Sequence, residues 1–84
     1  IIKFLESKGF ITVKVIVANK AGCGDIVACD PQGYYWEIEV KTPSGRASKL
    51  QEVRIKGLQK QGARAFICYG YDDFLVKYNH ATVI

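Results

Sequence analysis

The side chains best suited to chemistry are two carboxylates and an amine, Asp25, Glu39 and Lys41. Asp25 follows a glycine-containing turn, whereas Glu39 and Lys41 stand two apart at the end of an alternating segment. Residues two apart on a strand point to the same face of a sheet. If the two segments pair as a hairpin, Asp25 lies beside Glu39. Two converging carboxylates predict a site for a hard divalent cation, with the carbonyl oxygen of Val40 as a further ligand.

Such a site would suit attack on a phosphoryl group. A bound divalent cation lowers the pKa of a coordinated water and polarises a phosphoryl oxygen. The amine of Lys41 would hold the attacking water or neutralise charge that develops in the transition state. The competing interpretation is a solvated strand face, on which a Glu39–Lys41 pair contributes little.

Two features favour the site over the solvated face. The helix expected after the turn at residues 42–45 should cover this face of the sheet, so that the charges lie in a cleft. Ser48 and Gln51 stand at the start of that helix, where the amide of Gln51 can be directed into the same cleft.

The periodicity of apolar residues predicts the elements that position these groups. Helices are expected over residues 1–8, 46–61 and 71–79, strands over residues 10–19, 25–29, 34–41 and 63–70, and a further edge strand over residues 81–84. The order predicts an α/β fold, a small mixed β-sheet flanked by helices.

The faces of two elements can also be predicted. On the strand at residues 34–41, one face is apolar and should point to the core, and the other carries the charges. The core face is expected to consist of Tyr34, Trp36, Ile38 and Val40, and the opposite face of Tyr35, Glu37, Glu39 and Lys41. On the long helix, the packing face is expected to consist of Leu50, Val53, Gly57 and Leu58, with Ile55 off it.

Length and composition limit the class of protein. The 84 residues fit a single domain, and 49% hydrophobic residues exclude an intrinsically disordered chain. No segment approaches the roughly 18 apolar residues of a membrane span, because lysines interrupt the richest part. A domain of this size has a thin core, which favours a homodimer. The net charge of +4 permits a nucleic-acid partner without requiring one.

The three cysteines, Cys23, Cys29 and Cys68, are an odd number without a regular spacing. We interpret them as free, buried thiols in a reducing compartment. A zinc site that combines them with His80 is disfavoured because the chain has no C-x-x-C pair.

An ordered set of motifs resembles a known family. The motifs are Gly24-Asp25, Ile38-Glu39-Val40-Lys41-Thr42-Pro43-Ser44-Gly45, Ser48-x-x-Gln51 and Gly62-Ala63. Together they resemble the virus-type replication-repair nuclease (VRR-NUC) domain, a branch of the PD-(D/E)XK nuclease superfamily, over about residues 1–73. The resemblance implies a restriction-endonuclease-like core and a metal-dependent phosphodiesterase that acts on DNA. It also implies that Asp25 and Glu39 hold Mg²⁺ or Mn²⁺, that Lys41 positions the nucleophilic water, and that Gln51 lines the site.

Two positions depart from the family pattern. Gly24 stands where the family often has proline, and we expect little consequence because a turn residue is kept. The family usually adds a glutamate from its first helix, which is expected before Ile1, since Glu6 lies too near the helix end to replace it. Glu37 shares the face of Glu39, but we interpret it as a flanking or surface residue, because only Glu39 stands two positions before the lysine.

The expected partner is DNA. Phosphate contacts are predicted for Arg46 and Lys49 at the start of the long helix and for Lys14 and Lys20 beside the first hairpin. No recognition helix is apparent, so branched or structured DNA is favoured over sequence readout. Standalone members of the family resemble the archaeal Holliday junction resolvases in pairing two subunits, which implies a homodimer, and the family implies the cytoplasm of a bacterial or phage-infected cell. The alternatives are a non-catalytic DNA-binding or assembly module on the same fold, and a sequence-specific restriction-type endonuclease.

Overall fold

The computed structural model describes residues 1–16, 18 and 22–82. Its elements are α1 (Ile2–Ser7), β1 (Ile11–Lys14), β2 (Ile26–Cys29), β3 (Tyr35–Lys41), α2 (Lys49–Lys60), β4 (Arg64–Tyr69) and α3 (Tyr71–Thr82). They form a four-stranded sheet in the order β1-β2-β3-β4, with antiparallel pairing of β1 to β2 and β2 to β3 and parallel pairing of β3 to β4. The predicted α/β fold with a mixed sheet is confirmed.

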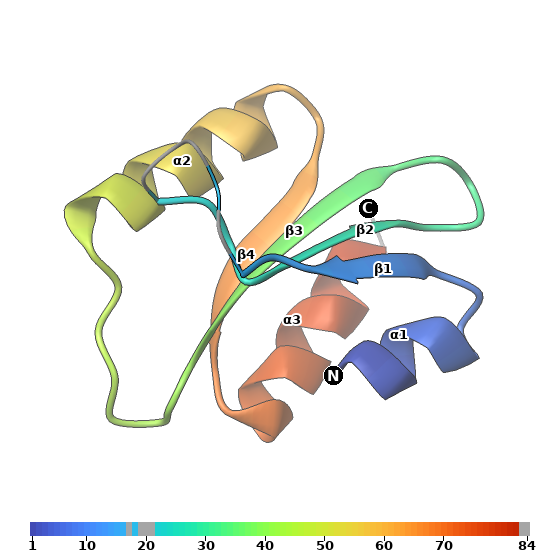
Figure 1. Ribbon diagram of the computed structural model, residues 1–84, viewed down its shortest axis with the longest axis horizontal. Helices are drawn as coiled ribbons and strands as arrows, with labels where there is room; N and C mark the ends of the chain where they lie inside the picture. Colours follow the sequence, from blue (N-terminus) through green and yellow to red (C-terminus); the bar gives the residue numbers. More distant parts are fainter. Residues whose placement is uncertain (17, 19–21, 83–84) are drawn as a thin grey trace.

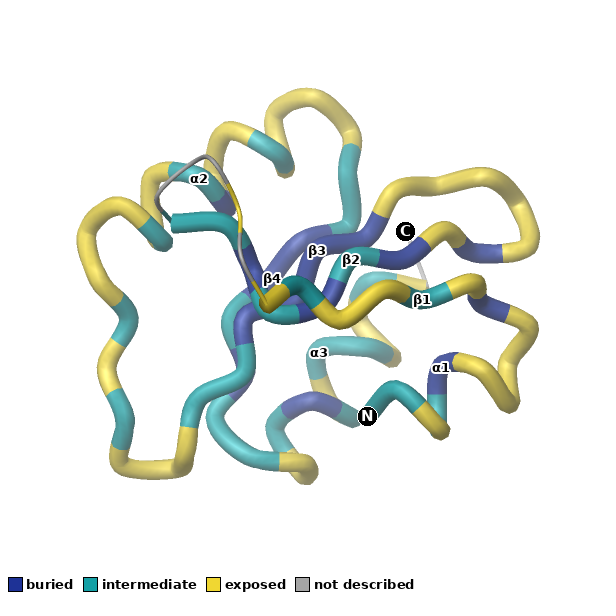
Figure 2. The backbone as a smooth tube through the Cα atoms, in the orientation of Figure 1, coloured by how far each residue is buried: buried dark blue, intermediate teal, exposed yellow. Residues whose placement is uncertain are grey.

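The helices lie on both faces of this sheet. Figure 1 shows α2 on one face and α1 and α3 on the other. The main core fills the layer between the sheet and the pair α1 and α3. Its buried members are Leu5, Phe10, Ile26, Ala28, Trp36, Ile38, Phe66, Cys68 and Phe74. In Figure 2 the buried positions gather along the inner strands, while the turns and the outer side of α2 are exposed.

Strand β3 is central and is covered on both faces. Trp36 and Ile38 are fully buried on the α1–α3 side, as the alternation predicted. Tyr34, predicted for the same face, precedes the strand and is 46% exposed, so its assignment to the core is wrong. Glu37 and Glu39, on the opposite face, are 0% and 4% exposed. The charged face of β3 therefore lies beneath α2, and the interpretation of this face as a solvated surface is wrong.

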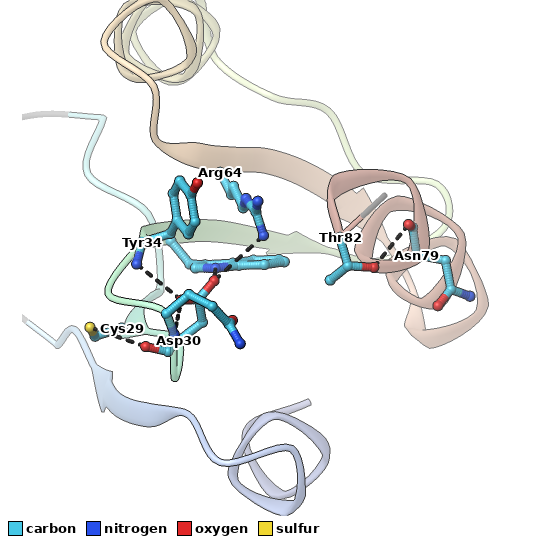
Figure 3. A network of polar contacts seen from close by, with 8 residues as sticks. Cys29, Asp30, Tyr34, Arg64, Asn79 and Thr82 are labelled. Carbon is cyan, nitrogen blue, oxygen red and sulfur yellow. Dashed lines mark hydrogen bonds and ion pairs between the residues drawn. The ribbon is translucent and has the colours of Figure 1, made fainter. Parts of the chain in front are cut away.

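The turn between β2 and β3 is fixed by one buried carboxylate, Asp30, which is shown in Figure 3. Asp30 accepts hydrogen bonds from the backbone N–H of Tyr34 (3.0 Å), and also from that of Gln32 and from the Trp36 indole (2.9 Å each). Arg64 of β4 forms an ion pair with it at 3.5 Å and lies 4.0 Å from the ring of Tyr34. This network holds the hairpin in the register that aligns Ile26 with Ile38.

Two predicted strand segments are corrected. The first strand covers Ile11–Lys14 rather than residues 10–19, and residues 17 and 19–21 lie outside the described part of the chain. The edge strand predicted over residues 81–84 is wrong for Ala81 and Thr82, which belong to α3, and residues 83–84 lie outside the described part. The helix continues because Ala81 packs against the core, one turn beyond Tyr78.

The predicted packing face of α2 is wrong except for Leu58. Leu50 and Val53 are 58% and 57% exposed, and Gly57 is exposed, whereas Ile55 is only 6% exposed. The less exposed positions of α2 are Gln51, Arg54, Ile55 and Leu58. Because the sheet face beneath α2 carries charges, polar side chains of the helix turn inward, and a count of apolar residues selects the wrong side.

The outer edge of β4 is closed by side chains of the two flanking helices. The contacts are Gln59 Nε2 to the Ala65 carbonyl (2.8 Å), Lys77 Nζ to the Ile67 carbonyl (2.6 Å), and the Tyr69 N–H to Asp73 Oδ2 (2.8 Å). These bonds occupy one backbone group on every second residue along the edge, so a further strand that used those groups would have to break them.

Within the described residues, no helix has both the length and the apolar character needed to cross a membrane.

Candidate active site

The hairpin of β2 and β3 brings Asp25 and Glu39 together. Ile26 is aligned with Ile38, so one step further along the antiparallel register places Asp25 across from Glu39. The Oδ2 atom of Asp25 accepts a hydrogen bond of 2.8 Å from the Val40 N–H. This bond ties the carboxylate of Asp25 to the strand that carries Glu39, so the two acids are neighbours across the hairpin, and their joint role at a site stays a prediction.

Glu39 has one oxygen paired and one oxygen free of protein donors. Its Oε2 atom lies 3.1 Å from Lys41 Nζ, whereas Oε1 is buried and has no hydrogen-bond partner among the described residues. Burial raises the pKa of Glu39, and the neighbouring Asp25 carboxylate raises it further, against the opposing effect of Lys41. A buried, incompletely neutralised acid of this kind is stabilised by an added positive charge.

These features fit a divalent cation. Asp25 and Glu39 lie across from each other on neighbouring strands, and the buried Oε1 of Glu39 accepts no hydrogen bond from the described residues. Carboxylate oxygens suit Mg²⁺ and Mn²⁺, and Mg²⁺ commonly retains several waters beside one or two carboxylates. No group of three or more His, Cys, Asp or Glu residues suited to a metal occurs among residues 1–16, 18 and 22–82. Asp25, Glu39 and the carbonyl oxygen of Val40 remain predicted ligands.

Lys41 lies at the open end of the site. Its side chain is 22% exposed, and the chain turns directly after it, with the Gly45 N–H donating to the Thr42 carbonyl at 2.9 Å. A Cβ added at Gly45 would lie 3.2 Å from the Lys41 Cβ, so the turn folds back closely over the lysine. The amine is therefore held beside Glu39 and remains partly accessible to solvent.

Gln51 has a structural role at the start of α2. Its Oε1 accepts the Ser48 N–H at 2.9 Å, and the Ser48 hydroxyl accepts the Gln51 N–H at 3.1 Å. The Ser48-x-x-Gln51 spacing thus forms a capping box. The side-chain carbonyl of Gln51 is occupied there, and its direct part in chemistry stays a prediction.

Glu37 is not a surface residue. It is completely buried, and its carboxylate accepts hydrogen bonds from the Gly24 N–H (2.9 Å), the Tyr35 hydroxyl (2.5 Å) and the guanidinium of Arg54 (2.5 and 2.9 Å). Burial opposes ionisation of Glu37, but the bonds from Arg54, Tyr35 and Gly24 outweigh it and lower the pKa of Glu37. The pairing raises the pKa of Arg54, and burial with the nearby Glu37 raises that of Tyr35 to about 12.

Sequence reasoning missed Arg54. The signal was present, because a carboxylate on a covered strand face requires a cation, and Arg54 stands three residues after Gln51 on the covering helix. Arg54 was overlooked because the predicted packing face of α2 did not include it.

Glu6 does not reach the site. It is exposed on α1, on the opposite side of the sheet from α2, and accepts a hydrogen bond of 3.2 Å from the Thr12 hydroxyl. Thr12 is aligned with Ala28, three residues along β2 from Asp25. The expectation that Glu6 cannot stand in for a first-helix glutamate agrees with this position.

The predicted DNA-binding cations are exposed where they are described. Lys14 is aligned with Ile26, next to Asp25, and Arg46 and Lys49 lie just after the turn that follows Lys41. Lys20 lies outside the described residues. Because Ile26 and its partner Ile38 point to the core, the side chain of Lys14 lies on the face of the sheet opposite Asp25 and Glu39. DNA contact by Lys14, Arg46 and Lys49 stays a prediction.

All three cysteines are free thiols, but they are not all buried. Cys68 lies in the core, where burial raises its pKa to about 11. Cys23 is half-buried, and Cys29 is exposed on β2 because no helix covers that part of the sheet face. The prediction that all three are buried is therefore wrong for Cys29.

The mixed sheet with helices on both faces, and the pair of acids next to a lysine, are compatible with an α/β nuclease core. Comparison with solved structures supports this fold: a structure described as a VRR-NUC domain superposes with a TM-score of 0.78 at 22% identity, over 93% of this chain and 85% of the other. A search of curated proteins finds no match. The sequence model of the VRR-NUC domain matches residues 11–72. The chain therefore belongs to the VRR-NUC family, a family of nuclease-type domains.

Proposed function

We propose that this protein is an endonuclease that hydrolyses phosphodiester bonds in DNA and depends on Mg²⁺ or Mn²⁺. The observation that supports this most directly is the juxtaposition, under α2, of Asp25 and the incompletely paired Glu39 with the Lys41 amine at 3.1 Å. Membership of the VRR-NUC family supports the same conclusion.

Each residue has a defined part in this proposal. Asp25 and Glu39 hold the cation, which when bound polarises a phosphoryl oxygen and lowers the pKa of water. The Val40 N–H orients Asp25 through its 2.8 Å hydrogen bond. Lys41 holds the attacking water and counters the negative charge that grows on the phosphoryl oxygens. Gln51 lines the entrance to the site from the start of α2.

The substrate we propose is branched DNA, cut by a homodimer in the cytoplasm of a bacterial or phage-infected cell. Lys14, Lys20, Arg46 and Lys49 would contact phosphates and fix the position of the DNA without reading its sequence. The support for a dimer is the small core of the domain, which a second copy would extend. Sedimentation at micromolar concentration should give twice the chain mass of 9.4 kDa, and a mass of one chain would contradict the dimer.

The second candidate is a non-catalytic DNA-binding or assembly module. The observation that favours it is the small number of protein ligands, since Glu6 points away and Asp25 and Glu39 are the acids at the site in the described part of the chain. Such a module would bind DNA without cutting it.

Cleavage of a labelled four-way junction and of a linear duplex, each with Mg²⁺ and with Mn²⁺, separates these candidates. The parent chain should cut the junction near the branch, and Asp25→Asn and Lys41→Ala should lower the rate at least 100-fold. Glu52→Gln, an exposed change on α2, serves as the control and should cut at the parental rate. Equal rates for the parent and both site variants would overturn the proposal. Cuts at one fixed sequence of the linear duplex would instead indicate a restriction-type enzyme.

A further inference from the structure

The carboxylate of Glu37 is saturated by hydrogen bonds, although it points to the same face as Glu39. Its Oε2 accepts from the Gly24 N–H and from Arg54 Nε, and its Oε1 accepts from the Tyr35 hydroxyl and from the second guanidinium nitrogen of Arg54. The side chain is fully buried, so these donors replace all of its water. Glu37 is thereby withheld from any cation at the neighbouring site.

This network is joined directly to the candidate metal ligands. Gly24 precedes Asp25, so the bond from the Gly24 N–H to Glu37 and the bond from Val40 N–H to Asp25 attach two adjacent residues of the turn to β3. The fit at Gly24 is tight, since an added Cβ would lie 2.8 Å from the Glu37 Cγ and 3.0 Å from the Ile38 carbonyl oxygen. The position of Asp25 along β3 therefore depends on where the Glu37 carboxylate is held.

Arg54 holds that carboxylate from α2. Its bonds to the two oxygens of Glu37 are bidentate, which fixes the plane of the carboxylate as well as its position. Arg54 also balances charge, because among the described residues the acids Asp25, Glu37 and Glu39 are accompanied by two paired cations, Lys41 and Arg54. With Glu37 neutralised by Arg54, the remaining excess of one negative charge is concentrated on Asp25 and Glu39.

We infer that Arg54 is a positioning residue of the candidate metal site, acting through Glu37 and the Gly24 N–H to set Asp25 against Glu39. The inference rests on the proposed function and extends it to residues outside the E-x-K motif. Arg54 itself touches neither the cation nor DNA in this role, and its removal leaves a buried, unpaired charge on Glu37.

The test measures Mn²⁺ binding by isothermal titration calorimetry on the complete chain without DNA, together with urea unfolding. Arg54→Gln should raise the dissociation constant for Mn²⁺ about 10- to 100-fold, the usual effect of removing a group that orients a ligand. Arg54→Lys keeps the charge but loses the bidentate geometry, so its dissociation constant for Mn²⁺ should lie between those of Arg54→Gln and the parent. Lys56→Gln, the loss of an exposed cation on the same helix, should bind as the parent does.

The double variant Glu37→Gln/Arg54→Gln removes the unpaired buried charge, so it tests the inference even if Arg54→Gln alone fails to fold. A neutral glutamine at residue 37 still accepts the Gly24 N–H, so the double variant should bind Mn²⁺ more tightly than Arg54→Gln alone. In cleavage assays, the difference in cleavage rate between Arg54→Gln and the parent should become smaller as Mn²⁺ approaches saturation. The reason is that the substitution weakens metal binding rather than the chemical step.

Three outcomes decide the matter. If variants that unfold at lower urea bind Mn²⁺ with the parental affinity, Arg54 only stabilises the fold and the inference is overturned. If the double variant binds no better than Arg54→Gln, the path through Glu37 is wrong. A parent chain that neither binds Mn²⁺ nor cuts DNA overturns the proposed function, and the inference falls with it.

Discussion

At the scale of single residues, three buried acids differ in how completely they are paired. Asp30 and Glu37 accept several hydrogen bonds each, and both have a pKa below the usual value. Glu39 keeps one buried oxygen without a partner in the described structure, and its pKa is raised. The contrast separates carboxylates that stabilise the fold from one that is destabilising unless a cation binds.

Glu39→Gln should therefore stabilise the metal-free protein. A carboxylate with a raised pKa lowers stability at pH 7, and a neutral amide removes that cost although it loses the ion pair with Lys41. We expect the free energy of unfolding in urea, measured with a chelator present, to rise by about 1 kcal/mol. Mn²⁺ should stabilise the parent but not the variant. A variant less stable than the parent under chelation would contradict this account.

Asp30 should make stability depend on acid pH. Burial opposes its ionisation, but the bonds from Trp36 and from the Tyr34 and Gln32 N–H groups, with the charge of Arg64, outweigh it and lower the pKa below 3.8. The stabilisation that ionised Asp30 gives the folded state is therefore complete above pH 3.8. It is lost as the pH falls through the lower pKa that Asp30 has in the folded state. Asp30→Asn should cost about 2 kcal/mol at pH 7, and the difference from the parent should shrink below about pH 4.

Urea unfolding of the parent and Asp30→Asn at a series of pH values checks this. A difference that stays constant from pH 7 to about pH 3 would show that the network stabilises through packing rather than through charge.

At the scale of elements, α2 contacts a charged sheet face through a mixed inner side. Ile55 is its buried apolar residue, while Arg54 meets Glu37. The exposed Leu50 and Val53 contribute little to packing in the isolated chain. The orientation of α2 is therefore fixed by few contacts, of which one is ionic.

Alanine substitutions on α2 should separate its two sides. Ile55→Ala should lower the free energy of unfolding by about 2–4 kcal/mol because it leaves a cavity against the sheet. Leu50→Ala should change it by less than about 0.5 kcal/mol because the side chain is already exposed. Chemical denaturation of both variants measures the difference. Equal decreases in the free energy of unfolding would support the packing face expected from the sequence.

At the scale of the whole molecule, the predicted cations should produce a strong dependence of DNA binding on salt. Replacing both Arg46 and Lys49 by glutamine should reduce the slope of log affinity against log salt by about 1.8, or about 0.9 per phosphate contact. The affinity should fall equally for DNA of different sequence. Fluorescence anisotropy with a chelator, which prevents cleavage, measures the slope.

Lys3→Gln is the control for this measurement, because Lys3 is exposed on α1, across the sheet from α2. An unchanged slope for the double variant would show that Arg46 and Lys49 do not contact DNA phosphates.

Much of this architecture follows from periodicity. The alternation in β3 gives its two faces, and the order of elements gives the sheet and the pairing of Asp25 with Glu39. The errors arise where tertiary contacts override local pattern. Burial of Glu37 depends on Arg54, a residue 17 positions away, and the inner side of α2 is polar because the sheet beneath it is charged. Periodicity counts apolar residues, so it cannot detect an interface formed by an ion pair.

The side-chain bonds along the edge of β4 limit how this sheet can grow. Of the four described strands, only β1 retains an outer edge to which another strand can be added. A sheet with two free edges can lengthen into a fibre, because each new copy presents a fresh edge to the next. Two copies of this chain that joined β1 to β1 would have no free edge left, and assembly by strand addition would stop at a pair.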